Sequence, residues 1–491
     1  MQQQSSSYRQ IFKATSLFGG VQIFIILISI IRSKFIAILL GPAGMGIAGL
    51  LTATTGMITG LTNFGLGTSA VRNVAEANAQ DDRQKISIVV TTLRRWVWIT
   101  GSLGTFVTLI LAPWLSEFTF GNKDYTYAFM FLSLTLLFSQ LSTGQNVILQ
   151  GTRELRYLAR SNVLGALLGL VITVPLYYYF GLQGIVPALV IASIVTLSLS
   201  WYFARKVVVD KTRLTFKETW QEGKSMLSMG IMLSLSGLIT LAASYLLQLY
   251  IGRTGGVEDV GLYNAGFAII GTYVGLVFTA MSTDYYPRLS GVAHSNQLAK
   301  EIINQQAEIA ILILAPILMT FFVFIHWGVQ LLYSSRFIAI NGMIQWAALG
   351  MFFKAASWAI AFLFLAKGAS RVFFVNESVA NAYILILNII GYKHWGLDGL
   401  GISFLLGYVI YLLQVFCICN RKYMFNFDKK FIIIFLTQLT CAIACFCVIK
   451  FIPNPYQYLM GSTLIAVSAI YSLKELDKRL EFKSIILKLR Q

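Results

Sequence analysis

The sequence predicts an all-α protein that crosses a membrane many times. Of its 491 residues, 57% are hydrophobic and only 12% are charged, whereas a soluble domain carries about 25% charged residues. The apolar residues fall in long runs, and a run of about 20 residues is enough to cross a bilayer as a helix. The 35 Phe, 23 Tyr and 9 Trp residues also exclude a disordered chain. A polytopic membrane protein follows, and neither an ordinary soluble enzyme nor a disordered chain fits this composition.

Fourteen apolar runs are long enough to be transmembrane helices. Several exceed 25 residues, so we expect tilted helices or helices that extend into the cytosol. The predicted spans are 11–40, 45–73, 86–112, 125–150, 159–180, 184–206, 225–252, 260–287, 299–327, 340–366, 372–392, 397–419, 430–451 and 455–473.

The distribution of Lys and Arg predicts the orientation of these spans. If the N-terminus is cytoplasmic, thirty of the 38 basic residues lie in inside segments, five lie outside and three lie within spans. Basic residues concentrate on the cytoplasmic side of membrane proteins. We therefore expect both termini in the cytosol, in a bacterial cytoplasmic (inner) membrane. The excess of positive charge belongs to these loops and does not predict nucleic-acid binding.

The segment after residue 473 and the cysteines predict no catalytic chemistry. Residues 474–491 alternate apolar and basic positions, which predicts an amphipathic cytoplasmic tail on the anionic inner leaflet. The five cysteines lie inside two apolar segments without metal-ligand spacing, and the chain has only three histidines. We expect no metal, no cofactor and no catalytic residue.

An internal repeat is indicated at an offset of 215 residues. The motif Gly-Leu-x-Gly begins at Gly181 and again at Gly396, and the same offset relates Gly46 to Gly261 and Arg156 to Arg371. Six spans per repeat give two lobes with one orientation and a pseudo-two-fold axis along the membrane normal. The predicted parts are an N-terminal lobe, a cytoplasmic linker, a C-terminal lobe, two extra helices and the tail, over 1–206, 207–224, 225–420, 421–473 and 474–491.

Basic residues inside the spans predict a cavity for an anion. Arg32 and Lys34 lie in the first span, on different faces of a helix, and Lys354 lies near the middle of the tenth. Charges at such depth are costly and are functional candidates by default. With Arg72 at an inner helix end, these residues form the predicted cavity set, and a phosphate-bearing ligand suits them.

Three arginines at inner helix ends are candidates for an inner gate. Arg156 and Arg371 are related by the repeat, and Arg288 ends the eighth span. They can attract an anionic substrate, but ordinary interface anchors would look the same. Five tyrosines also lie near helix ends, and an interfacial belt explains them better than sugar contacts do. These are Tyr177, Tyr178, Tyr179, Tyr285 and Tyr286.

Three acidic residues are candidates for coupling to a proton or sodium ion. Glu377 lies six residues into the eleventh span beside Asn376, and Glu308 lies in the first half of the ninth. Asp284 precedes Arg288 by four residues, so a helical ion pair is an alternative role for it. A structural partner for a nearby cation is the alternative for Glu377.

Four short stretches resemble the Wzx-type O-antigen and enterobacterial common antigen translocases of the multidrug/oligosaccharidyl-lipid/polysaccharide (MOP) exporter superfamily. They lie in matching order between about residues 12 and 420, which is most of the chain. The stretches are Gly41-Pro42-Ala43-Gly44-Met45-Gly46, Phe120-Gly121-Asn122-Lys123-Asp124-Tyr125, Tyr286-Pro287-Arg288-Leu289-Ser290 and Leu365-Ala366-Lys367-Gly368-Ala369-Ser370-Arg371.

The resemblance implies a flippase that moves polyprenyl (undecaprenyl)-diphosphate-linked oligosaccharide from the cytoplasmic to the periplasmic leaflet. It places Lys34, Lys354 and Glu377 where the family commonly has a basic, a basic and an acidic residue. The last two spans are a departure from twelve-span members of the family. Expected partners are this substrate, membrane lipids and the polysaccharide polymerase machinery.

Two other functions stay open. A multidrug exporter of the same superfamily would favour a carboxylate-rich cavity for cationic drugs, whereas the deep charges here lean cationic. A saccharide ligase or polymerase would need reactive groups in a large outside loop. The outside loops here are short, and their acids form no clear pair.

Overall fold

The computed structural model describes residues 21, 24–80, 82–207, 209–210 and 212–480. Over this part of the chain the structure consists of helices joined by short turns, with no strand. Ten of these helices are long and apolar enough to cross a membrane, and a bent pair, Phe216–Met232 and Gly237–Thr254, adds an eleventh. The all-α polytopic class predicted from composition is confirmed.

The chain forms two compact units, Met1–Gly261 and Leu262–Gln491. The first unit contains a helix over residues 24–39 and seven further helices. α8 packs against α2, α3 and α4. Their bounds are α2 (Gly41–Thr62), α3 (Leu66–Ala79), α4 (Arg83–Phe120), α5 (Thr126–Gly151), α6 (Leu155–Phe180), α7 (Ile185–Ala204) and α8 (Phe216–Thr254).

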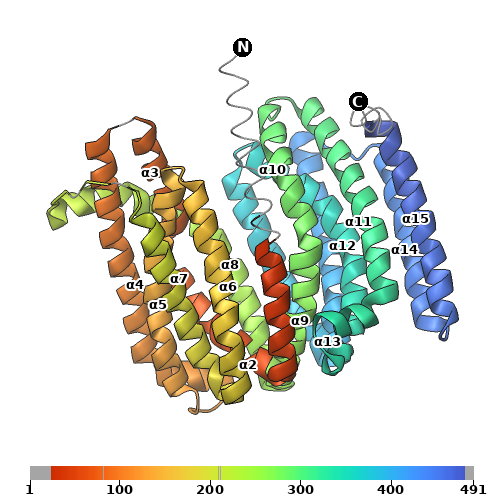
Figure 1. Ribbon diagram of the computed structural model, residues 1–491. Helices are drawn as coiled ribbons and strands as arrows, with labels where there is room; N and C mark the ends of the chain where they lie inside the picture. The colour runs from red at the N-terminus through yellow and green to blue at the C-terminus, as the bar shows by residue number, and fades with distance from the viewer. Residues whose placement is uncertain (1–20, 22–23, 81, 208, 211, 481–491) are drawn as a thin grey trace, which may run out of the picture. The chain divides into compact units, whose positions relative to one another are not determined.

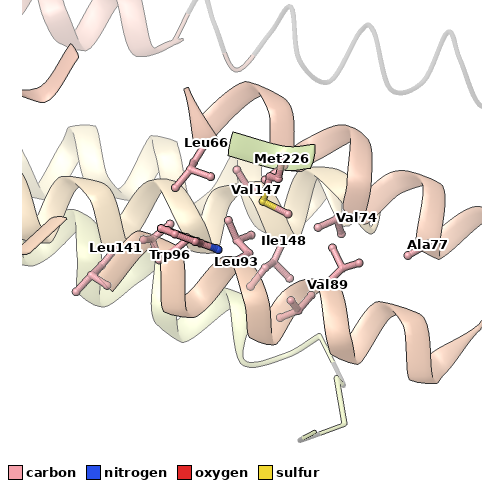
Figure 2. Close-up of a cluster of buried hydrophobic side chains, with 13 residues drawn as sticks. Leu66, Val74, Ala77, Val89, Leu93, Trp96, Leu141, Val147, Ile148 and Met226 are labelled. Carbon is pink, nitrogen blue, oxygen red and sulfur yellow. The ribbon is translucent and has the colours of Figure 1, made fainter. Parts of the chain in front are cut away.

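A buried apolar cluster holds four helices of the first unit together. Figure 2 shows Leu66, Leu93, Trp96, Ile148 and Met226 within this cluster, which α3, α4, α5 and α8 build. Burial of such side chains contributes about 1.5–3 kcal/mol each. The cluster therefore fixes the start of α8, which directly follows the predicted linker, onto the body of the unit.

The second unit continues α9 (Val257–Ala268) through one turn of π-helix at Ile269–Val274. α11 packs against α12, α14 and α15, which lie around it in Figure 1. The remaining bounds are α10 (Gly275–Gly291), α11 (Asn296–Leu332), α12 (Asn341–Ala366), α13 (Ser370–Tyr423), α14 (Lys429–Phe451) and α15 (Tyr456–Leu480).

α15 extends beyond the span predicted for it. Lys474–Leu480, the start of the predicted tail, is a direct continuation of this helix. Leu476 is 8% exposed, so it packs against protein. The rest of the predicted tail, residues 481–491, lies outside the described residues.

The two Gly-Leu-x-Gly motifs form equivalent reversals of the chain. Gly181 has φ +53° and ψ −131°, and Gly396 has φ +56° and ψ −137°, a conformation open to glycine alone. The backbones of Gly391 and Gly399 touch, because a Cβ on Gly391 would lie 2.5 Å from the carbonyl oxygen of Gly399. α13 is therefore a hairpin of two helices, as α6 and α7 are, and this agreement supports the predicted repeat.

Gly46 and Gly261 make a reciprocal backbone contact. A Cβ on Gly46 would overlap the carbonyl oxygen of Val257, and one on Gly261 would overlap the carbonyl oxygen of Pro42. Pro42 and Val257 are separated by the same 215 residues as the two glycines. An exchange of this kind, in which each partner offers the same surface, is typical of a local two-fold axis.

Candidate functional site

Lys354 projects from α12 toward the second half of α13. Its ammonium nitrogen lies 5.1 Å from the ring centre of Tyr408 and 5.7 Å from that of Phe404. A cation over an aromatic face at this distance is stabilised by about 0.5–2 kcal/mol. No carboxylate within the described residues makes an ion pair with Lys354. The charge thus remains able to bind an anion.

Glu377 is held by polar groups from the other half of the α13 hairpin. The hydroxyl of Tyr411 donates a 2.5 Å hydrogen bond to Oε1 of Glu377, and Nδ2 of Asn376 lies 3.2 Å from the same oxygen. Gln414 in turn donates a 2.9 Å hydrogen bond to Oδ1 of Asn376. Glu377 is therefore a hydrogen-bonded carboxylate within the unit rather than the partner of a cation.

Two tyrosines connect the two predicted residues of this unit. The rings of Tyr408 and Tyr411 lie 6.0 Å apart, edge to face, so Lys354 contacts Tyr408 and Tyr411 contacts Glu377. We call Lys354, Tyr408, Tyr411 and Glu377 the α12–α13 cluster. Sequence reasoning missed both tyrosines. Their signal is the spacing of Phe404, Tyr408 and Tyr411, which places the three rings on one helix face.

The predicted cations of the first unit lie on separate surfaces. Arg32 is exposed and Lys34 half-buried on the helix over 24–39, which agrees with their different faces. Arg72 is exposed on α3, where its guanidinium reaches Sδ of Met229 on α8 at 3.6 Å. Whether these residues share a cavity with Lys354 stays a prediction.

The predicted gate arginines lie at helix ends and are exposed. Arg156 and Arg371 occupy the second position of α6 and of α13, which begin 215 residues apart. Arg288 lies 3.9 Å from Asp284, and both side chains are solvent-accessible, at 42% and 83%. Asp284 thus forms the helical ion pair that was the alternative to ion coupling.

Glu308 is committed to an ion pair. It is 7% exposed, and Nε of Arg479 lies 2.7 Å from its carboxylate. Arg479 also contacts Glu475 at 2.6 Å. In this structure Glu308 is therefore a structural link between α11 and α15, and its proposed role in ion coupling would require this pair to open.

A cavity of about 760 Å³ surrounds this ion pair in the second unit. Its charged lining has both signs, so it has no net preference for an anion. The charged residues that line it are Arg288, Glu301, Glu308, Asp428, Lys430, Glu475, Lys478 and Arg479.

The family model for polysaccharide biosynthesis proteins matches residues 35–342, more than half of the chain. The chain belongs to this polysaccharide biosynthesis family. A relative, the lipid III flippase of Escherichia coli (strain K12), is 22% identical over 400 residues, covering 79% of this chain and 94% of its own length. The stage V sporulation protein B of Bacillus subtilis (strain 168) is 30% identical over 142 residues, 28% of this chain and 27% of its own.

Solved structures show which fold this family member has. The lipid II flippase MurJ in an inward closed conformation has a TM-score of 0.73 at 12% identity and covers 94% of this chain and 99% of its own. An inward-facing MATE transporter of the MOP superfamily has a TM-score of 0.66 at 16% identity, over 82% and 94%. These findings confirm the resemblance to the MOP superfamily. Since α14 and α15 exceed a tenth of the chain, the MurJ match must include part of them.

Proposed function

We propose that this protein is a flippase for a polyprenyl-diphosphate-linked oligosaccharide. It would move a repeat unit of O-antigen or a similar surface polysaccharide from the cytoplasmic to the periplasmic leaflet of a bacterial inner membrane. The observation that carries this proposal is Lys354, a cation within a membrane helix that only aromatic rings face. The likeness to the lipid III flippase over most of both chains supports the same substrate class.

The physical task is to move only the head group, because the polyprenyl tail can stay in lipid throughout. A diphosphate in a membrane interior needs charge compensation. We assign this role to Lys34 and Lys354, with Arg32 and Arg72 as further cations. Alternating access between the leaflets would then carry the head group across, and no covalent step is required of the protein.

Two further features of the cycle are part of the proposal. Arg156, Arg288 and Arg371 would attract the diphosphate at the cytoplasmic end before it enters. Glu377 would exchange a proton or sodium ion by releasing its hydrogen bond from Tyr411. The substrate, the surrounding lipids and the polysaccharide polymerase machinery are the partners that such a cycle implies.

A multidrug exporter with the same fold is the second candidate. The MATE-like structure favours it, but a cationic drug needs an available carboxylate in the membrane. In the described chain, Glu308 is paired with Arg479, Asp284 with Arg288, and Glu377 is hydrogen-bonded to Tyr411. The charge balance therefore favours an anionic substrate over a cationic one.

The test is transport by the purified protein in proteoliposomes. The substrate is lipid-linked oligosaccharide extracted from the cells that produce the protein, and its appearance in the opposite leaflet is measured by accessibility to a membrane-impermeant glycosidase. We expect protein-dependent flipping that a cationic dye does not compete. Absence of flipping, together with efflux of cationic dyes, would favour the exporter instead.

A further inference from the structure

A second cavity lies inside the first unit, apart from every predicted site residue. It has a volume of about 440 Å³, within the 300–1,000 Å³ typical of ligand pockets. Helices α2, α5, α7 and α8 line it. None of its lining residues is ionisable, and most carry a hydroxyl or amide group. The lining is Thr52, Thr55, Gly56, Thr59, Gly60, Asn63, Thr135, Leu136, Ser139, Ser193 and Leu241.

α2 supplies most of the polar lining from one face. Thr52, Thr55, Thr59 and Asn63 follow one another at spacings of three or four residues, so they form one row along the helix. Gly56 lies within this row, and a Cβ atom placed on it would meet nothing within 4 Å. The row therefore faces open space rather than a neighbouring helix.

The threonine hydroxyls of this row are oriented as hydrogen-bond acceptors. Each donates its proton to a carbonyl oxygen one turn earlier: Thr52 to Ala48 at 2.7 Å, Thr55 to Leu51 at 2.9 Å and Thr59 to Thr55 at 2.8 Å. No donor from the described residues reaches these three hydroxyl oxygens.

Two other side chains complete the set of hydrogen-bonding groups. Oδ1 of Asn63 accepts from the backbone nitrogen of Gly65 at 2.9 Å, which turns its amide NH₂ toward other acceptors. The hydroxyl of Ser139 has no hydrogen-bond partner within the described chain and can donate or accept. The cavity thus offers several acceptors and fewer donors, all neutral.

This chemistry excludes the charged ligand classes. A diphosphate would find no cation here, and a cationic drug would find no carboxylate. A sugar residue is neutral, and each of its hydroxyls both donates and accepts a hydrogen bond. We propose that this cavity, the threonine pocket, binds neutral sugar residues of the lipid-linked oligosaccharide while the cations hold its diphosphate. The inference rests on the proposed function and adds to it the part of the substrate that the basic residues do not recognise.

The experiment compares binding of two lipids by the whole protein in nanodiscs. One is the lipid-linked oligosaccharide extracted from the producing cells, and the other is polyprenyl diphosphate without sugars. The variant is Thr55→Val/Thr59→Val, which keeps the side-chain shape but removes two acceptors. The control is Thr196→Val, an exposed α7 residue outside the pocket whose hydroxyl also donates one turn back, to Ala192 at 2.9 Å.

We expect the double variant to weaken binding of the oligosaccharide lipid about tenfold and to leave polyprenyl diphosphate binding unchanged. Two neutral hydrogen bonds at about 0.5–1.5 kcal/mol each account for this factor. A second variant, Gly56→Leu, fills the open space with carbon and should give the same selective loss. Thr196→Val should match the wild type with both lipids.

Other outcomes overturn the inference in distinguishable ways. Equal losses for both lipids would show that the threonines matter only for folding, and unchanged binding of both would show that sugars bind elsewhere. In either case wild-type flipping would still support the proposed function. A wild type that neither binds nor flips either lipid would reject the proposed function, and this inference with it.

Discussion

Lys354 carries the charge on which the proposed function depends. Lys354→Ala should reduce flipping at least tenfold, because a hydrogen bond to a charged group contributes about 1.5–3 kcal/mol. Lys354→Arg should keep part of the activity, since the charge remains. The measurement is the initial flipping rate at equal amounts of inserted protein, with Lys393→Ala, an exposed residue, as the control. Full activity of a Lys34→Ala/Lys354→Ala double variant would reject the anion site.

Glu377 gives a second prediction for a single side chain. Glu377→Gln keeps the size of the side chain but removes its ability to exchange a proton. We expect flipping by this variant to lose its response to an imposed pH gradient and to keep its response to membrane potential. Tyr411→Phe, which removes the 2.5 Å hydrogen bond to Glu377, should alter the same response without abolishing it. An unchanged pH response in Glu377→Gln would limit Glu377 to a structural role.

The sequence predicts the charged residues of the α12–α13 cluster but not their neighbours. Lys354 and Glu377 stand out because charges are rare within apolar spans. Tyr411 does not, because tyrosine is common in membrane helices, and its contact with Glu377 arises only when the hairpin at Gly396 brings residues 34 positions apart together. Glu308 was interpretable as a coupling residue because Arg479, its partner, lies 171 positions away.

The link between α11 and α15 predicts the stability of the last helix. Arg479→Ala leaves Glu308 buried without its partner, which typically costs about 3–5 kcal/mol. Lys478→Ala is the matched control, since Lys478 contacts the same Glu475 but its side chain is 70% exposed, and it should cost about 1 kcal/mol or less. Thermal unfolding in detergent measures both.

The double variant Glu308→Gln/Arg479→Ala separates charge from packing. It should recover much of the loss of Arg479→Ala, because no uncompensated charge then stays buried. Equal unfolding temperatures for Arg479→Ala and Lys478→Ala would show that this ion pair does not stabilise α15.

Helix ends are predictable where glycine decides them and not where a distant contact does. Gly181 and Gly396 mark reversals because only glycine takes up their backbone conformation. The end of α15 differs from the predicted boundary at 473, because Lys474, Lys478 and Arg479 look like the start of a surface tail. Tertiary contacts of Arg479 and Leu476 instead extend the helix to Leu480.

For the whole molecule, the charge of the substrate predicts an electrical driving force. A diphosphate with about two negative charges moves outward down an inside-negative potential, at about 2.3 kcal/mol per charge per 100 mV. The empty, cation-lined carrier is drawn inward by the same potential. Flipping should therefore accelerate when an inside-negative potential is clamped in proteoliposomes at equal pH on both sides. Rates that do not depend on the potential would contradict this mechanism.

The number of membrane crossings and the superfamily follow from sequence, and the placement of the site does not. Apolar runs, glycine motifs and the Lys/Arg distribution are local properties, and they anticipated helices that the structure contains, including both hairpins. The threonine pocket escaped notice because Thr, Gly and Asn on α2 are as compatible with helix packing as with a cavity. Only the position of α5, α7 and α8 shows which of the two applies.

The contact between Gly46 and Gly261 has a consequence for the origin of this chain. Each half contributes one glycine and one carbonyl to the same reciprocal contact, so a protein of half the length would satisfy it by pairing with an identical copy. The contact thus describes an ancestral homodimer whose two subunits became joined by gene duplication. A change at one of these glycines would then break a surface that both ancestral subunits once shared, which a compensating change in its own half alone cannot restore.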